Sequence, residues 1–424
     1  MKALMFGWEF PPHISGGLGT ASYGLTRGLA KAGVEILFVM PKAYGDEDSS
    51  IGRIINASDV FTKTSIFGSE YWKNVDFLTI SSGLMPYLGV EEYESLRQES
   101  IHHKSFASHL GTKYQFTGKY GENLMEEVVR YAMVAATIAS EQQFDIIHAH
   151  DWLTYLAGIV AKRISGKPLV IHVHATEFDR SGESVNQTVY DLEKLGMNEA
   201  DAIMAVSNLT RNIVITKYNI DESKVFAVHN AVDFSGHETN AVTRKMNESI
   251  VTFLGRITFQ KGPEYFIEAA SKVLKRTQNV CFVMAGSGDM MNRMVKRVAK
   301  LNMGAKFHFT GFLKGDDVNR MYSYSDVYVM PSVSEPFGIS PLEAMRSGVP
   351  VIISKQSGVS EVLKHAIKIN FWDVDALADS IYALLNYKGV RQMITRCGYE
   401  EVNSFSWNDT AKIVKDIYSS ILYA

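Results

Sequence analysis

The sequence predicts an α/β fold made of two doubly wound domains, each built on an open parallel sheet. Three observations predict it. The chain has 424 residues, of which 46% are hydrophobic and 21% charged, and a single core stops growing near roughly 300 residues, so two domains are expected. Short β-rich apolar runs alternate with helical segments, which is typical of parallel sheets. This alternation occurs twice, once on each side of a polar stretch.

Residues 3–6 form the first expected strand, and a helix follows after a glycine-rich loop. The helix begins near Gly17 and ends at Gly33, because Leu25 and Leu29 repeat at helical spacing and a glycine suits the residue that follows a helix. Five further apolar runs predict the other strands of the first half, over residues 35–40, 145–148, 169–174, 202–206 and 225–228.

Residues 46–120 do not fit this plan. They contain a run of glutamates, many aromatic residues and three histidines, in a place where one short crossover would suffice. An insertion of this length is either functional or a solvated flap, and both interpretations remain open.

The second half repeats the plan. Expected strands over 250–254, 280–285, 307–310, 326–330 and 349–353 alternate with helices over 263–276, after Gly288 and after Ser340. The polar stretch 235–249 has no periodicity and predicts a linker, so we expect a first domain over 1–240 and a second over 241–405. A last helix over 406–424 has apolar residues at helical spacing that suit packing on either domain.

Charge and cysteine content exclude several classes of protein. The formal net charge is -3, so the chain has no basic field of the kind that binds nucleic acid or anionic lipid. Cys281 and Cys397 are the only cysteines, and they lie far apart, each in an apolar or helical context, so neither a disulfide framework nor a thiolate metal site is expected. The chain reaches Glu9 too early for a signal peptide, and no apolar run is long enough to span a membrane. We therefore expect a cytoplasmic protein without a membrane span.

Two loops at strand ends are suited to phosphate. Gly16 and Gly17 precede the first helix, where backbone amides and the positive end of the helix favour an anion. The spacing is not that of a dinucleotide fingerprint, and the alternative is that the glycines only let the helix pack close to the strand. Arg256 and Lys261 follow a strand of the second half, and a guanidinium fork with a lysine suits a pyrophosphate. Ligands of open parallel sheets bind beyond the carboxyl ends of the strands, so we expect a site in a cleft between the domains.

The segment 334–344 places two carboxylates around the start of a helix. Glu335 lies in a Pro/Gly loop and has no evident structural role. Ser340 and Glu343 match a capping box with Pro341 as the first helical residue, so Glu343 is either a helix cap or a ligand-binding residue. The backbone amides before this helix also favour an anion: those of Phe337, Gly338 and Ile339.

Four histidines and an aspartate follow two neighbouring expected strands of the first half. His148 and His150 alternate along one strand before Asp151, and His172 and His174 alternate along the next. Such a group can bind a metal, but an uncharged imidazole can also hydrogen-bond a sugar hydroxyl or have only a structural role in the core. These alternatives remain open at the level of the residues.

Together these motifs resemble the retaining glycosyltransferases of family 4, which have the GT-B fold of two Rossmann-like domains facing an interdomain cleft. The resemblance covers nearly the whole chain through segments 16–19, 150–152, 174–177, 230–233, 255–262 and 335–343. It implies transfer of a glycosyl group from a nucleotide sugar to a hydroxyl with the anomeric configuration kept, without a metal or other cofactor. It also implies that the last helix returns to the first domain.

The resemblance implies a role for each candidate residue. Arg256 and Lys261 would hold the donor diphosphate, Glu335 would lie against the sugar hydroxyls, and His174 would contact the sugar near its reacting carbon. The nucleotide would be bound by the remaining positions, with Glu343 on the ribose and residues 311–312 beside the base: Gly16, Gly17, Gly311, Phe312, Phe337, Gly338, Ile339 and Glu343.

Within the family the segment 8–19 and the long insertion look most like α-glucan synthases. The expected function is transfer of glucose from UDP- or ADP-glucose to the non-reducing end of a glucan such as glycogen. Ile14 stands where the related bacterial glycogen synthases have a lysine, which leaves donor and acceptor open. The alternatives are another polysaccharide, glycolipid or disaccharide acceptor, a sugar-nucleotide epimerase, an inactive sugar-nucleotide-binding regulator, and a histidine-based metal hydrolase.

Overall fold

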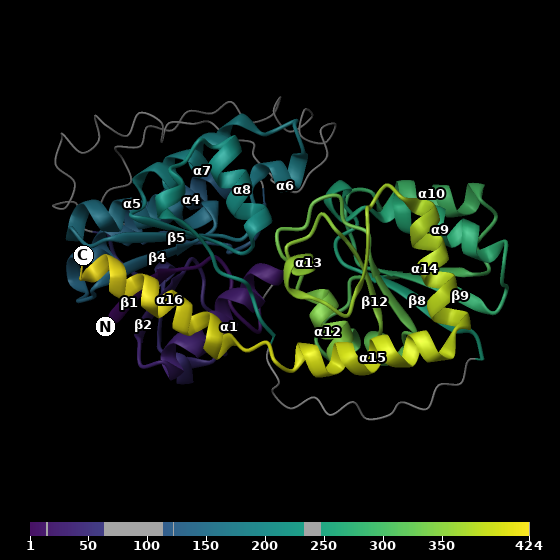
Figure 1. Cartoon of the computed structure of the whole chain (residues 1–424). Helices are drawn as coiled ribbons and strands as arrows, with labels where there is room; N and C mark the ends of the chain where they lie inside the picture. Colours follow the sequence, from purple (N-terminus) through teal and green to yellow (C-terminus); the bar gives the residue numbers. More distant parts are fainter. Residues whose placement is uncertain (14–15, 63–112, 122, 233–246, 424) are drawn as a thin grey trace.

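The computed structural model describes residues 1–13, 16–62, 113–121, 123–232 and 247–423. They form two domains that lie side by side, each with a sheet covered by helices (Figure 1). The first domain has a seven-stranded sheet of order β3-β2-β1-β4-β5-β6-β7, and the second has a six-stranded sheet of order β10-β9-β8-β11-β12-β13. Every strand pair is parallel. The predicted α/β class with two doubly wound parallel sheets is confirmed.

The first domain begins with β1 and ends with β7. The central strands β4, β5 and β6 are buried along their whole length, because parallel strands covered on both faces can be continuously apolar. The elements are β1 Lys2–Phe6, α1 Gly17–Lys31, β2 Glu35–Met40, β3 Arg53–Asn56, α4 Leu124–Glu141, β4 Ile146–His150, α5 Trp152–Ser165, β5 Leu169–Val173, α6 Glu177–Ser181, α7 Gln187–Glu199, β6 Ala202–Ala205, α8 Asn208–Lys217 and β7 Val225–Ala227.

The second domain repeats the alternation and carries a short 3-10 helix, η7, after its first strand. Its elements are β8 Ser249–Leu254, η7 Phe259–Lys261, α9 Pro263–Leu274, β9 Val280–Ala285, α10 Met291–Lys300, β10 Phe307–Gly311, α11 Asp316–Tyr324, β11 Val327–Met330, α12 Ser340–Arg346, β12 Val351–Ser354, α13 Val359–Val362, β13 Ile367–Ile369, α14 Val374–Asn386 and α15 Lys388–Val402. The predicted strands agree with the observed ones to within about two residues at each end.

Two strands were not predicted, and both lie at the edge of a sheet. β3 and β13 are short and only partly buried, so neither has the continuous apolar run that identifies a central strand. β3 lies inside the expected insertion 46–120, and Tyr114 and Phe116 of the same segment are buried in the core of the first domain. Treating all of 46–120 as an insertion was therefore wrong; residues 63–112 lie outside the described residues, as does residue 240 at the expected domain boundary.

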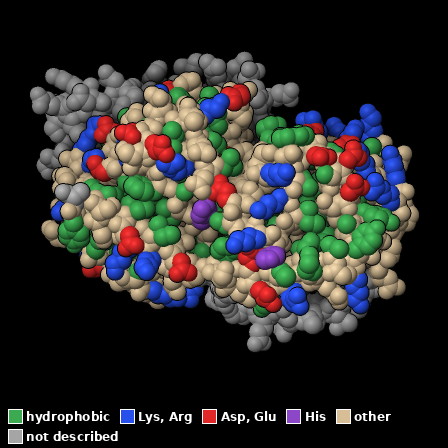
Figure 2. Space-filling model, in the orientation of Figure 1, with side chains coloured by type: hydrophobic (Ala, Val, Ile, Leu, Met, Phe, Trp, Pro, Cys, Tyr) green, Lys and Arg blue, Asp and Glu red, His purple; other side chains and the backbone are tan. Residues whose placement is uncertain are grey.

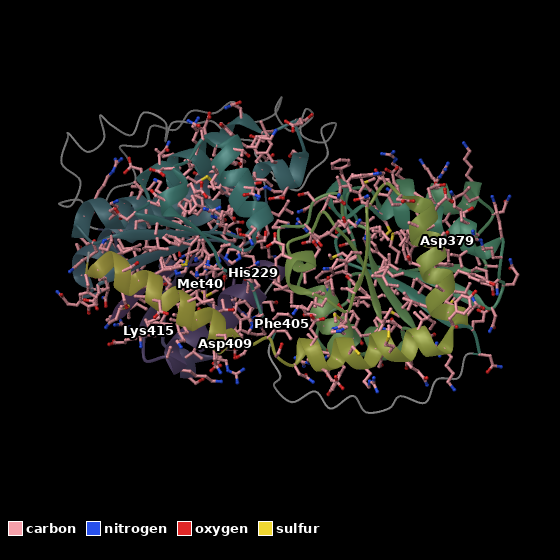
Figure 3. All side chains as sticks on the ribbon, in the orientation of Figure 1. Met40, His229, Asp379, Phe405, Asp409 and Lys415 are labelled. Carbon is pink, nitrogen blue, oxygen red and sulfur yellow. The ribbon has the colours of Figure 1, made fainter. Side chains whose placement is uncertain are left out.

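The last helix, α16 Trp407–Leu422, crosses from the second domain to the first and lies along α1 (Figure 1). Phe405 marks the passage from α15 to α16 (Figure 3). Gly24 of α1 is needed at this contact, because a Cβ there would lie 2.2 Å from the ring of Trp407. Tyr418, fully buried, packs beneath the sheet of the first domain. No helix in the described part of the chain has the length and apolar character to cross a bilayer.

Candidate active site between the two domains

Lys261 and Glu335, far apart in sequence, form an ion pair in the second domain. Lys261 ends η7 and Glu335 lies in the loop before α12; their side chains are 19% and 8% exposed. The hydroxyl of Ser332 donates a second hydrogen bond to Glu335 at 3.2 Å. The expectation that Glu335 has no structural role was therefore wrong, since two neighbours hold its carboxylate.

The loop that carries Arg256 and Lys261 is fixed against the segment before Glu335. The Arg256 guanidinium donates to the side-chain oxygen of Gln260 at 3.3 Å. The backbone carbonyl of the buried Gln260 accepts from the amide of Val333 at 2.9 Å. Gly262 has a φ of 64°, and a Cβ at this position would lie 2.2 Å from the carbonyl oxygen of Pro331. These contacts hold the loop that carries both cations, and Lys261 lies beside the Glu335 carboxylate without requiring a ligand.

The loop before α12 presents three backbone amides with no acceptor. Within the described residues, the N–H groups of Phe337, Gly338 and Ile339 donate no hydrogen bond, although the Phe337 carbonyl accepts from Val359 at 2.7 Å. Unpaired amides directly before a helix suit an anion. The predicted amides therefore lie in the same loop as Glu335, the partner of Lys261.

The predicted capping box of α12 does not form. The helix begins at Ser340, so Pro341 is its second residue, and no side chain caps it. The hydroxyl of Ser340 instead accepts a hydrogen bond from Tyr328 at 2.8 Å. Glu343 accepts one from Tyr322 at 3.1 Å, and burial raises the pKa of its carboxyl. Freed from capping, Glu343 is available for the other role considered, that of a ligand-binding residue.

The histidines of β4 and β5 form a row of side-by-side rings. His148, His150 and His172 are at most 1% exposed, and His150 Nδ1 lies 3.1 Å from His174 Nε2. Burial lowers the pKa of His148, His150 and His174, and that of His172 to about 3. The imidazoles are therefore neutral at physiological pH.

This row does not have the geometry of a metal centre. Ring nitrogens of His148, His150 and His172 lie within 4.8 Å of one another. The three ring planes, however, are within 20° of parallel. Because the nitrogen lone pairs lie in the ring planes, near-parallel rings cannot direct them to one tetrahedral centre. The residues present do not fit a histidine-bound metal.

Asp151 joins the end of β4 to the start of α5 and is a candidate for proton handling. Its φ is 65°, which is uncommon for a residue other than glycine. Burial raises the pKa of its carboxyl to about 6, against the opposing effects of Arg180 and of backbone hydrogen bonds from Ala175 and His174. Strained, buried and titrating near neutrality, Asp151 has features that cluster at functional sites.

Helices α6 and α7 share a buried cluster of one cation and two carboxylates. Arg180 forms ion pairs with Glu177 and Glu193, and all three side chains are at most 5% exposed. The hydroxyl of Tyr218 donates to Glu193. Burial raises the pKa of Glu193 to about 7, and Arg180 and Tyr218 oppose this only in part. The cluster fixes the segment that follows His174.

Several contacts join the domains near these residues. Asp179 of α6 accepts a hydrogen bond of 2.5 Å from the hydroxyl of Ser334, next to Glu335, and α6 packs against η7. The carboxylate of Glu361 accepts from the backbone amides of Asn208 and Leu209 at the start of α8, at 2.9 and 2.7 Å. The segment after His174 therefore meets the segment that carries Lys261 and Glu335.

His229 lies at the junction of the domains (Figure 3), where its Nε2 is 2.9 Å from Glu361. Lys and Arg side chains gather on this face of the molecule where the second domain approaches the first (Figure 2). Two of these interdomain features were not identified from the sequence: the contact between Asp179 and Ser334, and the role of Glu361. Thr176 and Asp179 do match a capping box, which could have located α6 but not its contact with a residue 155 positions away.

The remaining predicted residues lie at the start of α1 and at the end of β10. Gly16 and Gly17 are exposed, and a Cβ at either position would meet open space, so packing of the described chain does not require these two glycines. Gly311 ends β10 with a φ of 75°, and the next residue, Phe312, is 50% exposed beneath the ammonium of Lys314. No hydrogen bond among the described residues links Gly311 or Phe312 directly to the Lys261–Glu335 pair.

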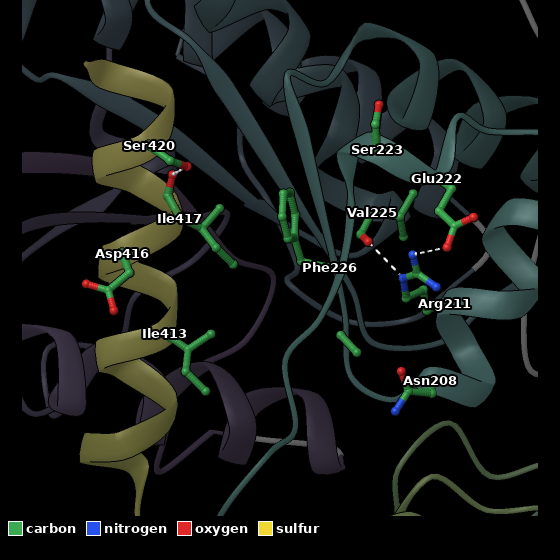
Figure 4. Close-up of a pocket in the computed structure, with 11 residues that line it drawn as sticks. Asn208, Arg211, Glu222, Ser223, Val225, Phe226, Ile413, Asp416, Ile417 and Ser420 are labelled. Atoms are coloured by element: carbon green, nitrogen blue, oxygen red, sulfur yellow. Dashed lines mark hydrogen bonds and ion pairs between the residues drawn. The ribbon is translucent and has the colours of Figure 1, made fainter. Parts of the chain in front are cut away.

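A cavity of about 510 Å³ lies elsewhere, between α8, β7 and α16 (Figure 4). Arg211 lies at its edge and donates hydrogen bonds to the Val225 carbonyl and to Glu222. None of the predicted site residues lines this cavity. The candidate site therefore rests on the contacts between the domains.

Two parallel-sheet domains, joined by a helix that returns to the first, with a basic loop facing the junction, define a GT-B glycosyltransferase. The family model for the starch synthase catalytic domain matches residues 2–224, more than half of the chain, and that for group 1 glycosyl transferases matches residues 237–401. The chain belongs to the glycosyltransferases with a starch synthase catalytic domain, followed by a group 1 domain.

Relatives and solved structures of the same kind extend over the whole chain. An uncharacterized glycosyltransferase of Methanocaldococcus jannaschii is 29% identical, over 99% of this chain and 98% of its own. The glycogen synthase of Mycobacterium tuberculosis is 22% identical, over 99% and 94%. Sucrose-phosphate synthase from Thermosynechococcus elongatus matches with a TM-score of 0.73 at 17% identity, over 100% of this chain and 99% of that one. Anabaena HepE, solved with UDP and glucose, matches with a TM-score of 0.68 at 16% identity, over 99% and 100%.

Proposed function

We propose that this glycosyltransferase moves a glucosyl unit from UDP- or ADP-glucose to the non-reducing end of an α-glucan such as glycogen, with the anomeric configuration retained. The observation that carries the proposal is the Lys261–Glu335 pair beside three backbone amides that have no acceptor among the described residues. The match of residues 2–224 to starch synthase catalytic domains supports a glucan acceptor. The full-length similarity to a glycogen synthase supports it further.

Arg256 and Lys261 hold the donor diphosphate in this proposal. As the bond to the sugar breaks, negative charge grows on the departing nucleotide, and fixed cations in a partly dry site stabilise that charge. The amides of residues 337–339 add neutral donors that need no reorganisation. Because these groups already supply charge and hydrogen bonds to the diphosphate, we expect turnover without added divalent metal.

Glu335 exchanges partners when the donor binds. Without donor, Lys261 neutralises its carboxylate. Once the diphosphate attracts the ammonium, the carboxylate can accept hydrogen bonds from the sugar hydroxyls, and Ser332 keeps it in place. Gly16, Gly17, Gly311, Phe312 and Glu343 complete the nucleotide site, with Glu343 on the ribose.

His174, which is neutral, contacts the sugar near its reacting carbon. The bond between this carbon and the phosphate oxygen breaks, and a bond to the acceptor oxygen forms on the same face. The acceptor proton passes to the departing phosphate oxygen. Asp151 is close enough to the His174 backbone to influence this step electrostatically. The proposal includes a cytoplasmic location, where nucleotide sugars are available.

A panel of donors and acceptors tests the proposal. Purified protein is incubated with UDP-, ADP- or GDP-glucose, with glycogen, maltooligosaccharides or no acceptor, and with or without EDTA. We expect glycogen-dependent nucleotide release from UDP- or ADP-glucose that EDTA does not reduce. Transfer only to a non-glucan hydroxyl would refute the glucan acceptor and indicate another one. If no common sugar nucleotide releases its nucleotide, the protein is an inactive sugar-nucleotide-binding protein.

A further inference from the structure

The row of imidazoles connects the candidate site with Tyr418, on the buried face of helix α16. Alternate residues of a strand point to one face, and His150 of β4 lies directly opposite His172 of β5. At one end of the row, His148 Nδ1 shares a hydrogen bond with the hydroxyl of Tyr418. At the other end, His150 Nδ1 shares one of 3.1 Å with His174 Nε2.

The His150–His174 bond has a preferred direction. Within the described residues, His150 Nε2 is sealed from solvent and has no partner. If His174 were the donor, the proton of neutral His150 would sit on this Nε2, as a buried N–H without an acceptor. Buried N–H groups without acceptors are rare in proteins, and unpaired acceptors are less so. His150 is therefore the donor, through its Nδ1–H.

This direction determines which nitrogen of His174 carries a proton. A neutral imidazole whose Nε2 accepts a hydrogen bond must hold its proton on Nδ1. No described residue is bonded to His174 Nδ1, and His174 is partly exposed, whereas His150 is fully buried. His174 can therefore donate to a ligand, while His150 cannot reach one.

We propose that His150 is a positioning residue that holds His174 in the Nδ1–H tautomer and fixes its ring, so that His174 donates a hydrogen bond to an oxygen of the donor sugar. The sugar as ligand rests on the proposed function; the tautomer does not. The rings of His172 and His174, with centroids 4.4 Å apart, restrict tilting of the His174 ring. Among the described residues, the hydrogen bond from His150 fixes the position of the His174 Nε2 edge.

Two variants of His150 separate hydrogen bonding from packing. The amide nitrogen of Asn, like Nδ1 of His, is bonded to Cγ, so His150→Asn retains a donor in the right place. The amide of Gln is one bond farther out, so His150→Gln loses it. His172→Phe is the matched control, because neither ring nitrogen of His172 has a partner among the described residues and a phenyl ring retains the stacking.

The test reads the His174 tautomer by long-range ¹H–¹⁵N correlation in histidine-labelled protein, with His174→Ala used for assignment. We expect protonated Nδ1 in the wild type, in His150→Asn and in His172→Phe, and loss of this tautomer in His150→Gln. A wild-type His174 protonated on Nε2, or an unchanged tautomer in His150→Gln, would overturn the proposal. If circular dichroism shows that His150→Gln does not fold, the other proteins still test the proposal. Protonation of His174 on Nε2 in the wild type and in His150→Asn would refute it.

Kinetics supply a second readout that a purely structural role would not produce. His150→Gln should lower kcat by about tenfold or more while leaving the acceptor KM near the wild-type value, and His150→Asn should recover most of kcat. Equal losses in both variants would overturn the positioning role. The NMR result needs no turnover, so an inactive wild type with the expected tautomer would refute the proposed function and leave the positioning of His174 standing.

Discussion

Replacing Lys261 by methionine separates the two roles of this lysine. Methionine retains much of the length but not the charge. Among the described residues, it leaves only Ser332 bonded to the Glu335 carboxylate, whose side chain is 8% exposed. Removing one partner of a fully buried ion pair costs about 3–5 kcal/mol. Since Lys261 is 19% exposed and Ser332 remains, we expect a loss of about 2–3 kcal/mol.

The effect on turnover should be larger and should not be recovered in the double variant. Lys261→Met removes a cation from the departing diphosphate and exposes that group to an unneutralised Glu335. We expect kcat to fall by about 100-fold or more, as for loss of a fixed donor in other enzymes. The double variant Lys261→Met/Glu335→Gln contains no unpaired charge, so it should regain most of the stability but none of the turnover.

Thermal and urea unfolding measure the stability of the single and double variants, and nucleotide release measures their turnover. Lys272→Met is the matched control, because Lys272 and Asp375 form an ion pair that is 40% and 76% exposed; we expect it to cost less than about 1 kcal/mol and to leave turnover unchanged. Wild-type stability of Lys261→Met would show that the pair does not support the fold. Wild-type turnover of the double variant would show that Lys261 serves only to neutralise Glu335.

Two further predictions concern charges away from the donor loop. Glu361→Ala removes an acceptor that joins the domains at α8, so small-angle X-ray scattering should give a larger radius of gyration. Burial raises the pKa of Glu361, but hydrogen bonds from His229 and the start of α8 lower it overall, so the wild type should expand similarly as the pH falls below about 4.5. Glu193→Gln should flatten the pH dependence of thermal stability. Because burial raises the pKa of Glu193 from 4.5 to about 7, its contribution is fully present below about 4.5, and up to about 3 kcal/mol is lost as the pH rises through about 7.

Glu400, an exposed residue of α15, supplies the control for both experiments. Glu400→Ala should leave the radius of gyration unchanged, and Glu400→Gln should leave the pH dependence of stability unchanged. A Glu361→Ala protein with wild-type dimensions would mean that other contacts suffice to hold the domains together. A Glu193→Gln protein whose stability still falls between pH 5 and pH 8 as in the wild type would assign that loss to another group.

The sequence predicted those parts of the fold that depend on local pattern. Central strands such as β9 are continuously apolar and were placed residue for residue. The edge strands β3 and β13 were missed, because both are only partly buried and their apolar runs are too short. The α12 capping box was predicted from spacing alone and does not form. The Ser340 hydroxyl instead accepts a hydrogen bond from Tyr328 of β11.

In the candidate site, too, features that depend on local sequence were predicted, and contacts between distant residues were not. Arg256 and Lys261 are identifiable because they share one loop at a strand end. The partner of Lys261 is Glu335, 74 residues away, and no local pattern specifies that pairing. The contact between Asp179 and Ser334 likewise depends on how the two domains meet. The His150–His174 bond follows from the register of β4 and β5, which the alternation of histidines indicates but does not determine.

The most direct test of the account is transfer of labelled glucose from UDP- or ADP-glucose to glycogen, followed by digestion of the product. The account predicts that label enters the polysaccharide and that an exo-acting α-glucosidase, which removes units from the non-reducing end, releases it as glucose. The Lys261→Met protein should incorporate about 100-fold less or lower. Nucleotide release without incorporation of label, or label resistant to the α-glucosidase, would contradict the claim that the Lys261–Glu335 site extends an α-glucan with retention.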